Sequence, residues 1–336
     1  MISKEEMDRI DSQGMYKIYD KWPEIANKYY NSDFESIEST GIDHIVFSGM
    51  GGSGSINDIF SSIFSKTDIR ISLIKGYELP KSVNQKTLVV STSVSGNSVE
   101  TLAILKSAKN KKCKNIGFAS GGLMEKFCLK NSIEFRKISM YQNPRSSFPS
   151  FLYGMLKTLQ EILPLKKTDV ISSIKSIKSL SKEISSDNLT ENNSAINMAK
   201  WITEIPVIYY PYGLQSVAIR FKNSLQENTK EHAMVENIIE ASHNGIVSWE
   251  GNKKLKPILI RGKDDHKKTK QRWEIFKQYF NEKKIDFYEL SSVNGNILTK
   301  SINLIYLLDY ASIYLSILKK TNPSPVDSIN FIRTRL

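Results

Sequence analysis

The chain has 336 residues, enough for two domains, because a single domain typically holds about 100 to 200 residues. Hydrophobic residues make up 40% of it and charged residues 24%, a composition that excludes a disordered or fibrous protein. The formal net charge is +12, yet the basic residues are spread along the chain without a helix-turn-helix, zinc-finger or RNP pattern, so no nucleic-acid partner is expected. A basic excess suits an anionic metabolite equally well.

Neither export nor a membrane partner is indicated. Residues 1–20 are charged and lack the apolar core of a signal peptide. The longest apolar segment, residues 302–318, contains Asp309, and we expect a buried helix there rather than a membrane span. The two cysteines, Cys113 and Cys128, are too few for a disulfide framework or a zinc site. We therefore expect a cytoplasmic protein with reduced cysteines.

The first half of the chain alternates short apolar runs with helical patterns. The sequence predicts strands at residues 44–48, 69–74, 87–93 and 115–120, and helices at residues 54–64 and 98–109. Alternation of this kind is typical of a doubly wound parallel sheet. We assign residues 1–160 to an N-terminal domain of the α/β class.

The same alternation of predicted strands and helices occurs in the second half of the chain. Residues 165–193, rich in Lys, Ser and Ile, are the expected connection between domains, with a solvated amphipathic helix as the alternative. Beyond them the sequence predicts strands at residues 206–210, 257–262 and 285–291, and helices at residues 217–230, 271–284 and 302–319. We assign residues 161–336 to a second parallel-sheet domain of similar build.

A glycine-rich turn follows the first predicted strand. The stretch GMGGSG, residues 49–54, has the G-x-G-x-x-G spacing that is often associated with dinucleotides. Such a site also needs an Asp or Glu about 20 residues further on, at the end of the second strand, to hold the ribose. Here that strand ends at Lys75. The pattern alone is weak, since a tight strand-to-helix turn also requires glycine.

A second loop favours a phosphate ligand. The predicted third strand leads into STSVSGNS, which carries five hydroxyl groups in eight residues at the start of a helix: Ser91, Thr92, Ser93, Ser95 and Ser98. Backbone N–H groups at a helix start attract an anion, and hydroxyls add charge-assisted hydrogen bonds. A Ser-rich turn with one N-cap is the alternative. Because loops after neighbouring parallel strands face one crevice, the two loops together predict a sugar phosphate rather than a dinucleotide.

These loops, with three further motifs, carry a family resemblance. GMGGSG and STSVSGNSVETL resemble the sugar-isomerase (SIS) domain, whose signature is a loop of the type S-x-S-G-N-T-x-E-T. The stretches NPR (143–145), VAIRFKNSLQENTK (217–230) and ASHNGIVSWE (241–250), with the tail TNPSPVDSINFIRTRL, are similar to archaeal-type bifunctional phosphoglucose/phosphomannose isomerases. The resemblance implies two flavodoxin-like SIS domains and a homodimer. It also implies reversible conversion of glucose 6-phosphate or mannose 6-phosphate into fructose 6-phosphate through a cis-enediol, without a metal or cofactor.

The resemblance also assigns roles to residues. The substrate phosphate would lie on Gly52, Ser53, Ser93, Ser95 and Ser98. Glu227 would be the base that moves the proton between C1 and C2, and Arg145 would stabilise the enediolate. His243 would assist ring opening, reaching across from the other subunit. These are the residue types that aldose-ketose isomerisation needs, although a surface Glu, an exposed His and an interdomain Arg ion pair are the structural alternatives.

The sequence departs from the family pattern at two positions. Gly245 stands where the family reads Glu after His-Asn, so a carboxylate is lost beside His243. Arg333 stands near the place of a family Lys in the C-terminal helix; Arg keeps the charge but does not give up a proton near neutral pH. Two other functions stay open: the same chemistry on a different phosphosugar, and a non-catalytic phosphosugar sensor of the SIS fold.

Overall fold

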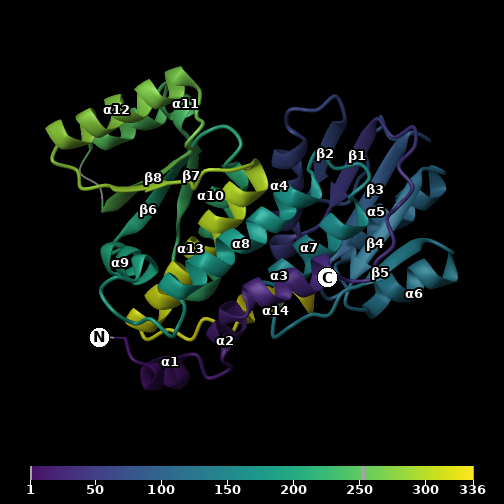
Figure 1. Ribbon diagram of the computed structural model, residues 1–336, viewed down its shortest axis with the longest axis horizontal. Helices are drawn as coiled ribbons and strands as arrows, with labels where there is room; N and C mark the ends of the chain where they lie inside the picture. Colours follow the sequence, from purple (N-terminus) through teal and green to yellow (C-terminus); the bar gives the residue numbers. More distant parts are fainter. Residues whose placement is uncertain (1, 252–253, 336) are drawn as a thin grey trace. The chain divides into compact units, whose positions relative to one another are not determined.

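The computed structural model describes residues 2–251 and 254–335, which form two compact units (Figure 1). The first unit is Lys21–Lys175, and the second combines the residues up to Asp20 with those from Ser176 onward. These limits differ from the predicted domains, 1–160 and 161–336. The chain passes from the first unit to the second inside helix α8 (Lys167–Ile184), within the segment predicted to connect the domains.

The first unit contains a five-stranded parallel sheet. Its strands are β1 (His44–Ser48), β2 (Arg70–Ile74), β3 (Thr87–Ser93), β4 (Lys114–Ala119) and β5 (Glu134–Lys137), in the spatial order β2-β1-β3-β4-β5. The chain order reverses between β1 and β3, which is where ligands bind in open parallel sheets. The remaining elements are α3 (Trp22–Tyr30), α4 (Gly51–Phe64), α5 (Val99–Asn110), α6 (Gly122–Lys130) and α7 (Phe148–Thr158).

Alternating side chains of the buried strands hold helices on both faces of this sheet. Val46 and Val89 pack with Ile104 of α5 in one core cluster. The next residue of β1, Phe47, stacks on Phe60 of α4, with ring centroids 5.1 Å apart. Successive residues of a strand point to opposite faces, so α4 and α5 lie on opposite sides. The doubly wound α/β prediction is confirmed.

The second unit repeats the design with four parallel strands. They are β6 (Ile205–Tyr210), β7 (Met234–Asn237), β8 (Leu255–Arg261) and β9 (Tyr288–Ser291), in the order β7-β6-β8-β9. The helical elements are α1 (Lys4–Ile10), α2 (Met15–Asp20), α9 (Ser194–Trp201), α10 (Gln215–Thr229), α11 (Ile238–Ala241), the short 3-10 helix η1 (Gly245–Glu250), α12 (Lys267–Glu282), α13 (Ile297–Leu318) and α14 (Asp327–Arg333). The short β5 and β7 were not predicted individually, because runs of four residues show little periodicity.

Helix α13 forms the core of the second unit. Among the described residues it is the one helix whose length and composition would suit a membrane span, and 89% of that stretch is buried in the protein. It therefore corresponds to the buried helix predicted from the sequence. The first 20 residues join this unit because Tyr306 of α13 donates a hydrogen bond to the carbonyl of Tyr19 (2.9 Å) and Tyr310 donates one to Asp20.

A buried ion pair fixes α10 against α13. The side chains of Arg220 and Asp309 are 2% and 0% exposed and approach to 2.5 Å. Arg220 Nε also donates to Asp309 (3.0 Å), and Ser224 Oγ donates to its other carboxylate oxygen (2.7 Å). One turn further on, Asn228 donates to Ser312 (2.8 Å). Residues four apart lie on one face of a helix, so these bonds fix how α10 is rotated.

Removal of one partner of this pair is expected to destabilise the protein strongly. Asp309→Ala leaves the Arg220 guanidinium buried without its carboxylate, and such changes cost about 3–5 kcal/mol of unfolding free energy. Urea denaturation should show this as a large fall in the midpoint. Asp187→Ala is the matched control, because the Asp187–Lys4 pair is exposed and such pairs contribute about 0–1 kcal/mol. Equal losses in both variants would contradict this account of α10.

Candidate functional site

The glycine-rich turn is a close-packed loop between β1 and α4. A Cβ on Gly49 would lie 2.9 Å from both the Asn57 side-chain nitrogen and the Thr92 carbonyl oxygen, distances that real Cβ atoms do not show. Gly51 has φ +53°, a conformation that favours glycine. Ser53 Oγ accepts a hydrogen bond from the backbone N–H of Val94 (3.2 Å). The first loop is therefore tied directly to the second, which follows β3.

The hydroxyl-rich loop between β3 and α5 is shaped by its own side chains. The Ser93 hydroxyl donates to Ser98 Oγ (3.1 Å) and accepts from the Ser98 N–H (3.4 Å). Ser93 is fully buried, whereas Ser95 and Ser98 are half-buried. Gly96 has φ +73°, and a Cβ there would overlap the Gly121 carbonyl oxygen. Ser95 and Ser98 are thus the hydroxyls open to a ligand, while Ser93 holds the loop together.

The NPR motif lies against the first loop. A Cβ on Gly52 would lie 3.4 Å from the carbonyl oxygen of Pro144, so the two segments are in van der Waals range. Asn143 holds the turn: its side-chain oxygen accepts the Ser146 N–H (3.0 Å), and its carbonyl accepts the Ser147 hydroxyl (2.7 Å). Arg145 is 3% exposed. The first unit therefore brings all the predicted phosphate-binding residues and Arg145 to one edge of its sheet.

Lys75 is a cation at this edge that the sequence analysis did not assign to the site. Its Cε lies 3.4 Å from the Cβ position of Gly54, and its Nζ is 2.8 Å from the carboxylate of Asp58. Asp58 is 7% exposed, and burial raises the pKa of its carboxyl, an effect that Lys75 opposes. Lys75 could have been recognised in the sequence because it follows β2, the strand that pairs with β1. Because Lys75 is paired with Asp58, it adds N–H donors rather than a free positive charge beside the predicted phosphate loops.

Glu227 lies in the last turn of α10 in the second unit. The next residue, Asn228, hydrogen-bonds to Ser312 of α13 and therefore lies on the buried face of α10. Glu227 lies beside that face and is half-buried. The helix ends at Lys230, which has a left-handed conformation with φ +62°. Lys230 Nζ donates to the carbonyls of Glu227 (2.5 Å) and Pro325 (2.7 Å). A cation that caps the last carbonyls holds the end of the helix in place.

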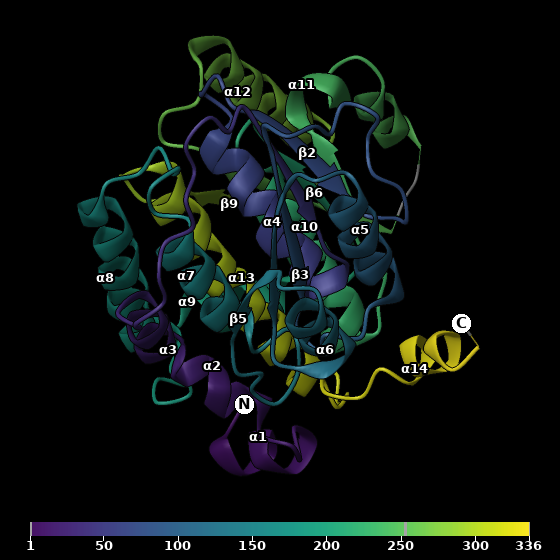
Figure 2. The same cartoon turned by 90° about the vertical axis from the view of Figure 1, so that its right-hand side faces the viewer.

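His243 and Arg333 are exposed in the second unit. His243 follows α11, and its backbone N–H donates to the carbonyl of Glu240 (2.8 Å). No hydrogen bond or ion pair within residues 2–251 and 254–335 involves its imidazole. Arg333 ends α14, a helix without buried residues that Figure 2 shows apart from α13. The surroundings of neither residue in this unit define a complete site.

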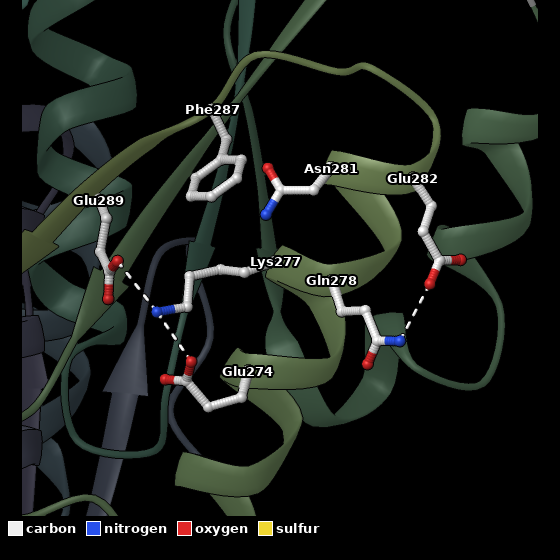
Figure 3. Close-up of a pocket in the computed structure, with 7 residues that line it drawn as sticks. All are labelled: Glu274, Lys277, Gln278, Asn281, Glu282, Phe287 and Glu289. Carbon is white, nitrogen blue, oxygen red and sulfur yellow. Dashed lines mark hydrogen bonds and ion pairs between the residues drawn. The ribbon is translucent and has the colours of Figure 1, made fainter.

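A groove on the second unit is not suited to a phosphosugar. It is lined by Glu274, Lys277, Gln278, Asn281, Glu282, Phe287 and Glu289 (Figure 3). Lys277 is already paired with Glu274 (2.9 Å) and Glu289 (3.3 Å), and Gln278 donates to Glu282 (2.9 Å). Three carboxylates against one ammonium would repel a phosphate dianion. None of the predicted site residues lies in this groove.

The chain is similar to proteins named as phosphosugar isomerases. Residues 191–336 match the family described as the bacterial phospho-glucose isomerase C-terminal SIS domain. The bifunctional phosphoglucose/phosphomannose isomerase of Caldicellulosiruptor bescii is 28% identical over 313 residues, covering 90% of this chain and 91% of that protein. Its namesake from Aquifex aeolicus is 27% identical over 323 residues, covering 93% and 97%. The resemblance seen in the sequence is confirmed.

Two further comparisons are more distant. The D-glucosamine-6-phosphate 4-epimerase of Sulfolobus acidocaldarius is 26% identical over 252 residues, covering 73% of this chain and 77% of that protein. Among solved structures, a hypothetical protein from Thermus thermophilus has a TM-score of 0.75 at 14% identity, covering 99% of this chain and 93% of that one. The latter supports the fold alone. The individual roles of Glu227, His243, Arg145 and Arg333 stay predictions.

The geometry of the second loop predicts a binding defect from a single hydroxyl. Ser95→Ala removes one half-buried hydrogen-bond donor without disturbing the Ser93–Ser98 contact. A hydrogen bond to a charged group is worth about 1.5–3 kcal/mol, so affinity for fructose 6-phosphate and for inorganic phosphate should both fall at least about tenfold. Calorimetric titration measures both. Ser65→Ala, at the opposite end of α4, is the control, and unchanged affinities in Ser95→Ala would exclude this loop as the phosphate anchor.

Proposed function

We propose that the protein reversibly converts glucose 6-phosphate and mannose 6-phosphate into fructose 6-phosphate. The observation that carries this proposal is similarity over 90% or more of the chain to two proteins named as bifunctional phosphoglucose/phosphomannose isomerases. The phosphate-compatible edge of the first unit supports it independently. The reaction moves a proton within the sugar and leaves its overall oxidation level unchanged, so it requires no redox cofactor.

Phosphate binding anchors the substrate in this proposal. The backbone of α4 begins at the glycine-rich turn and that of α5 just after Ser98, so two helix N-termini attract the phosphate. The half-buried hydroxyls of Ser95 and Ser98 supply hydrogen bonds, and the Lys75 ammonium, paired with Asp58, adds N–H donors beside them. Because Gly52 has no side chain, the substrate phosphate can approach the backbone of the first loop closely. Anchoring by the phosphate leaves C1 and C2 of the open-chain sugar for the catalytic groups.

Glu227 is the proposed base. Its carboxylate takes the proton from C2 of the aldose, forming a cis-enediol, and returns it to C1 to give the ketose. The bonds between α10 and α13 fix the helix that carries it, which reduces the freedom of the carboxylate. Arg145 would stabilise the negative charge that develops on the enediolate oxygens. One base serves both epimers because rotation about the C2–C3 bond of the cis-enediol presents either face of C2 to it.

His243 is proposed to assist ring opening from a second subunit of a cytoplasmic homodimer. A neutral imidazole can give a proton to the ring oxygen near pH 7. Its exposure leaves it accessible to a partner chain. Arg333 would contribute positive charge, without proton transfer. The small-molecule phosphosugar and this second subunit are the proposed partners.

The role of Glu227 predicts a loss of turnover with little loss of binding. Glu227→Gln keeps the size of the side chain and removes the base, so kcat for both aldoses should fall at least about 100-fold, the lower range of general-base contributions. KM should change little, because the phosphate is held elsewhere. A coupled assay of fructose 6-phosphate formation measures this. Gln226→Ala, at the exposed neighbouring position, is the control; turnover retained by Glu227→Gln would remove Glu227 from this role.

A shared site predicts complementation between subunits. Mixing inactive Glu227→Gln and His243→Ala chains should recover up to roughly a quarter of wild-type activity, because about half of the dimers would be mixed and each would hold one intact site. Subunit exchange is verified with differently tagged chains. Full exchange without recovered activity would contradict a site built from two subunits.

The alternative functions give different results in the same assays. The relative named as a D-glucosamine-6-phosphate 4-epimerase makes glucosamine 6-phosphate the informative additional substrate. Conversion of that sugar, with neither hexose 6-phosphate converted, would favour isomerisation or epimerisation of a different phosphosugar. Binding of phosphosugars without turnover of any would favour a sensor.

A further inference from the structure

Gly245 is packed against a carboxylate from a neighbouring strand. A Cβ added to Gly245 would overlap both carboxylate oxygens and Cδ of Glu236. Gly245 is the first residue of η1, and Glu236 lies on β7, nine positions earlier in the chain. The φ of Gly245 is not in the left-handed region, so backbone conformation does not require glycine. The Glu236 carboxylate, the free end of a flexible side chain, therefore occupies the space that a side chain at position 245 would fill.

The Glu236 carboxylate lies beside the turn that carries His243. The turn runs from His243 through Asn244 to Gly245, and two residues span at most about 7.6 Å of chain. Asn244 shapes it: its side-chain oxygen accepts the Gly245 N–H (2.5 Å), and its amide donates to Glu240 (2.8 Å). The carboxylates of Glu236 and Glu240 therefore both lie next to this turn.

The surroundings of Glu236 leave its charge uncompensated. Within residues 2–251 and 254–335 no hydrogen bond or ion pair reaches its carboxylate, although the side chain is half-buried. The ionisable groups that face it are Glu240 from α11, which repels it, and Tyr209 and Tyr210 from β6, whose phenol pKa values it helps to raise. Burial, followed by the charge of Glu240, raises the pKa of Glu236. Among the described residues this carboxylate has no cationic partner, so it is available to act on a neighbouring group.

We propose that Glu236 is the acidic positioning residue of the His243 turn and replaces the carboxylate that Gly245 lacks. The proposal rests on the proposed isomerase function of the same site. Glu236 acts through His243: a nearby carboxylate orients an imidazole and stabilises the positive charge that forms on it during proton transfer. In the conformation observed, the Glu236 carboxylate lies where a side chain at position 245 would lie.

The contact is tested by displacing the carboxylate. Gly245→Ala places a methyl group where the Glu236 carboxylate lies, so the end of that side chain must turn away. The melting temperature should change by at most about a degree, because a flexible side chain moves at little cost, whereas kcat should fall at least about threefold. Adding Gly245→Ala to Glu236→Ala should lower kcat no further, and equal losses of kcat in the two backgrounds would overturn the proposal.

The need for a negative charge beside His243 is tested by removing the Glu236 carboxylate and by moving it to position 245. Glu236→Gln should lower kcat at least tenfold, leave KM for fructose 6-phosphate within twofold, and shift the acid limb of the kcat profile to lower pH. The sign follows because burial raises the pKa of Glu236, so the wild type loses this carboxylate as pH falls, whereas Gln has no charge to lose. Glu236→Ala/Gly245→Glu should recover at least a third of the lost kcat, whereas Glu236→Ala/Gly245→Gln, of the same size but uncharged, should not.

Glu282→Gln, which removes a carboxylate in the groove of Figure 3, is the matched control and should match the wild type. Wild-type kcat and pH profile in Glu236→Gln, or equal recovery by Glu and Gln at position 245, would overturn the proposal while leaving the isomerase function intact. Failure of the function itself is distinguishable, because the wild-type protein would then convert neither aldose phosphate. That result would also overturn the positioning role of Glu236.

Discussion

All described strands of both sheets run parallel, and this constraint places the loops predicted to bind phosphate. In a parallel sheet every strand ends at the same edge, so loops from distant parts of the sequence meet there. The loop after β1 and the loop after β3 touch through Ser53 and Val94, and the NPR turn reaches the first loop at Gly52. Glycine permits these approaches, and the hydroxyl groups then provide polar contacts that an apolar loop would lack.

The second unit holds the proposed base, Glu227, by hydrogen bonds between two helices. A row of polar bonds between α10 and α13, centred on the buried Arg220–Asp309 pair, fixes the helix that carries Glu227. Buried ion pairs are a poor source of net stability, but they allow one geometry where apolar packing allows several. We infer that this pair serves the orientation of Glu227 more than the stability of the unit.

Local sequence patterns predicted the local features of the structure. The alternation of strands and helices, the turn at residues 49–54 and the helix α13 follow from periodicity and glycine chemistry, which act over a few residues. The packing of Tyr19 and Tyr16 against α13, which joins residues 1–20 to the second unit, depends on contacts almost 300 residues apart. Lys75 and Glu236 were missed for the same reason, because their importance comes from what lies beside them in space. The sequence showed that Gly245 replaces a carboxylate of the family pattern, but only the fold shows that the Glu236 carboxylate lies beside Gly245.

The central claim is that one site moves a proton between C1 and C2 of hexose 6-phosphates. The most direct measurement is proton NMR of fructose 6-phosphate incubated with the purified protein in D2O. The account predicts that glucose 6-phosphate and mannose 6-phosphate both appear, with deuterium at C2, because the proton held by the catalytic carboxyl exchanges with solvent. Persistence of fructose 6-phosphate unchanged, or its conversion into a sugar altered at C4 instead, would contradict the account.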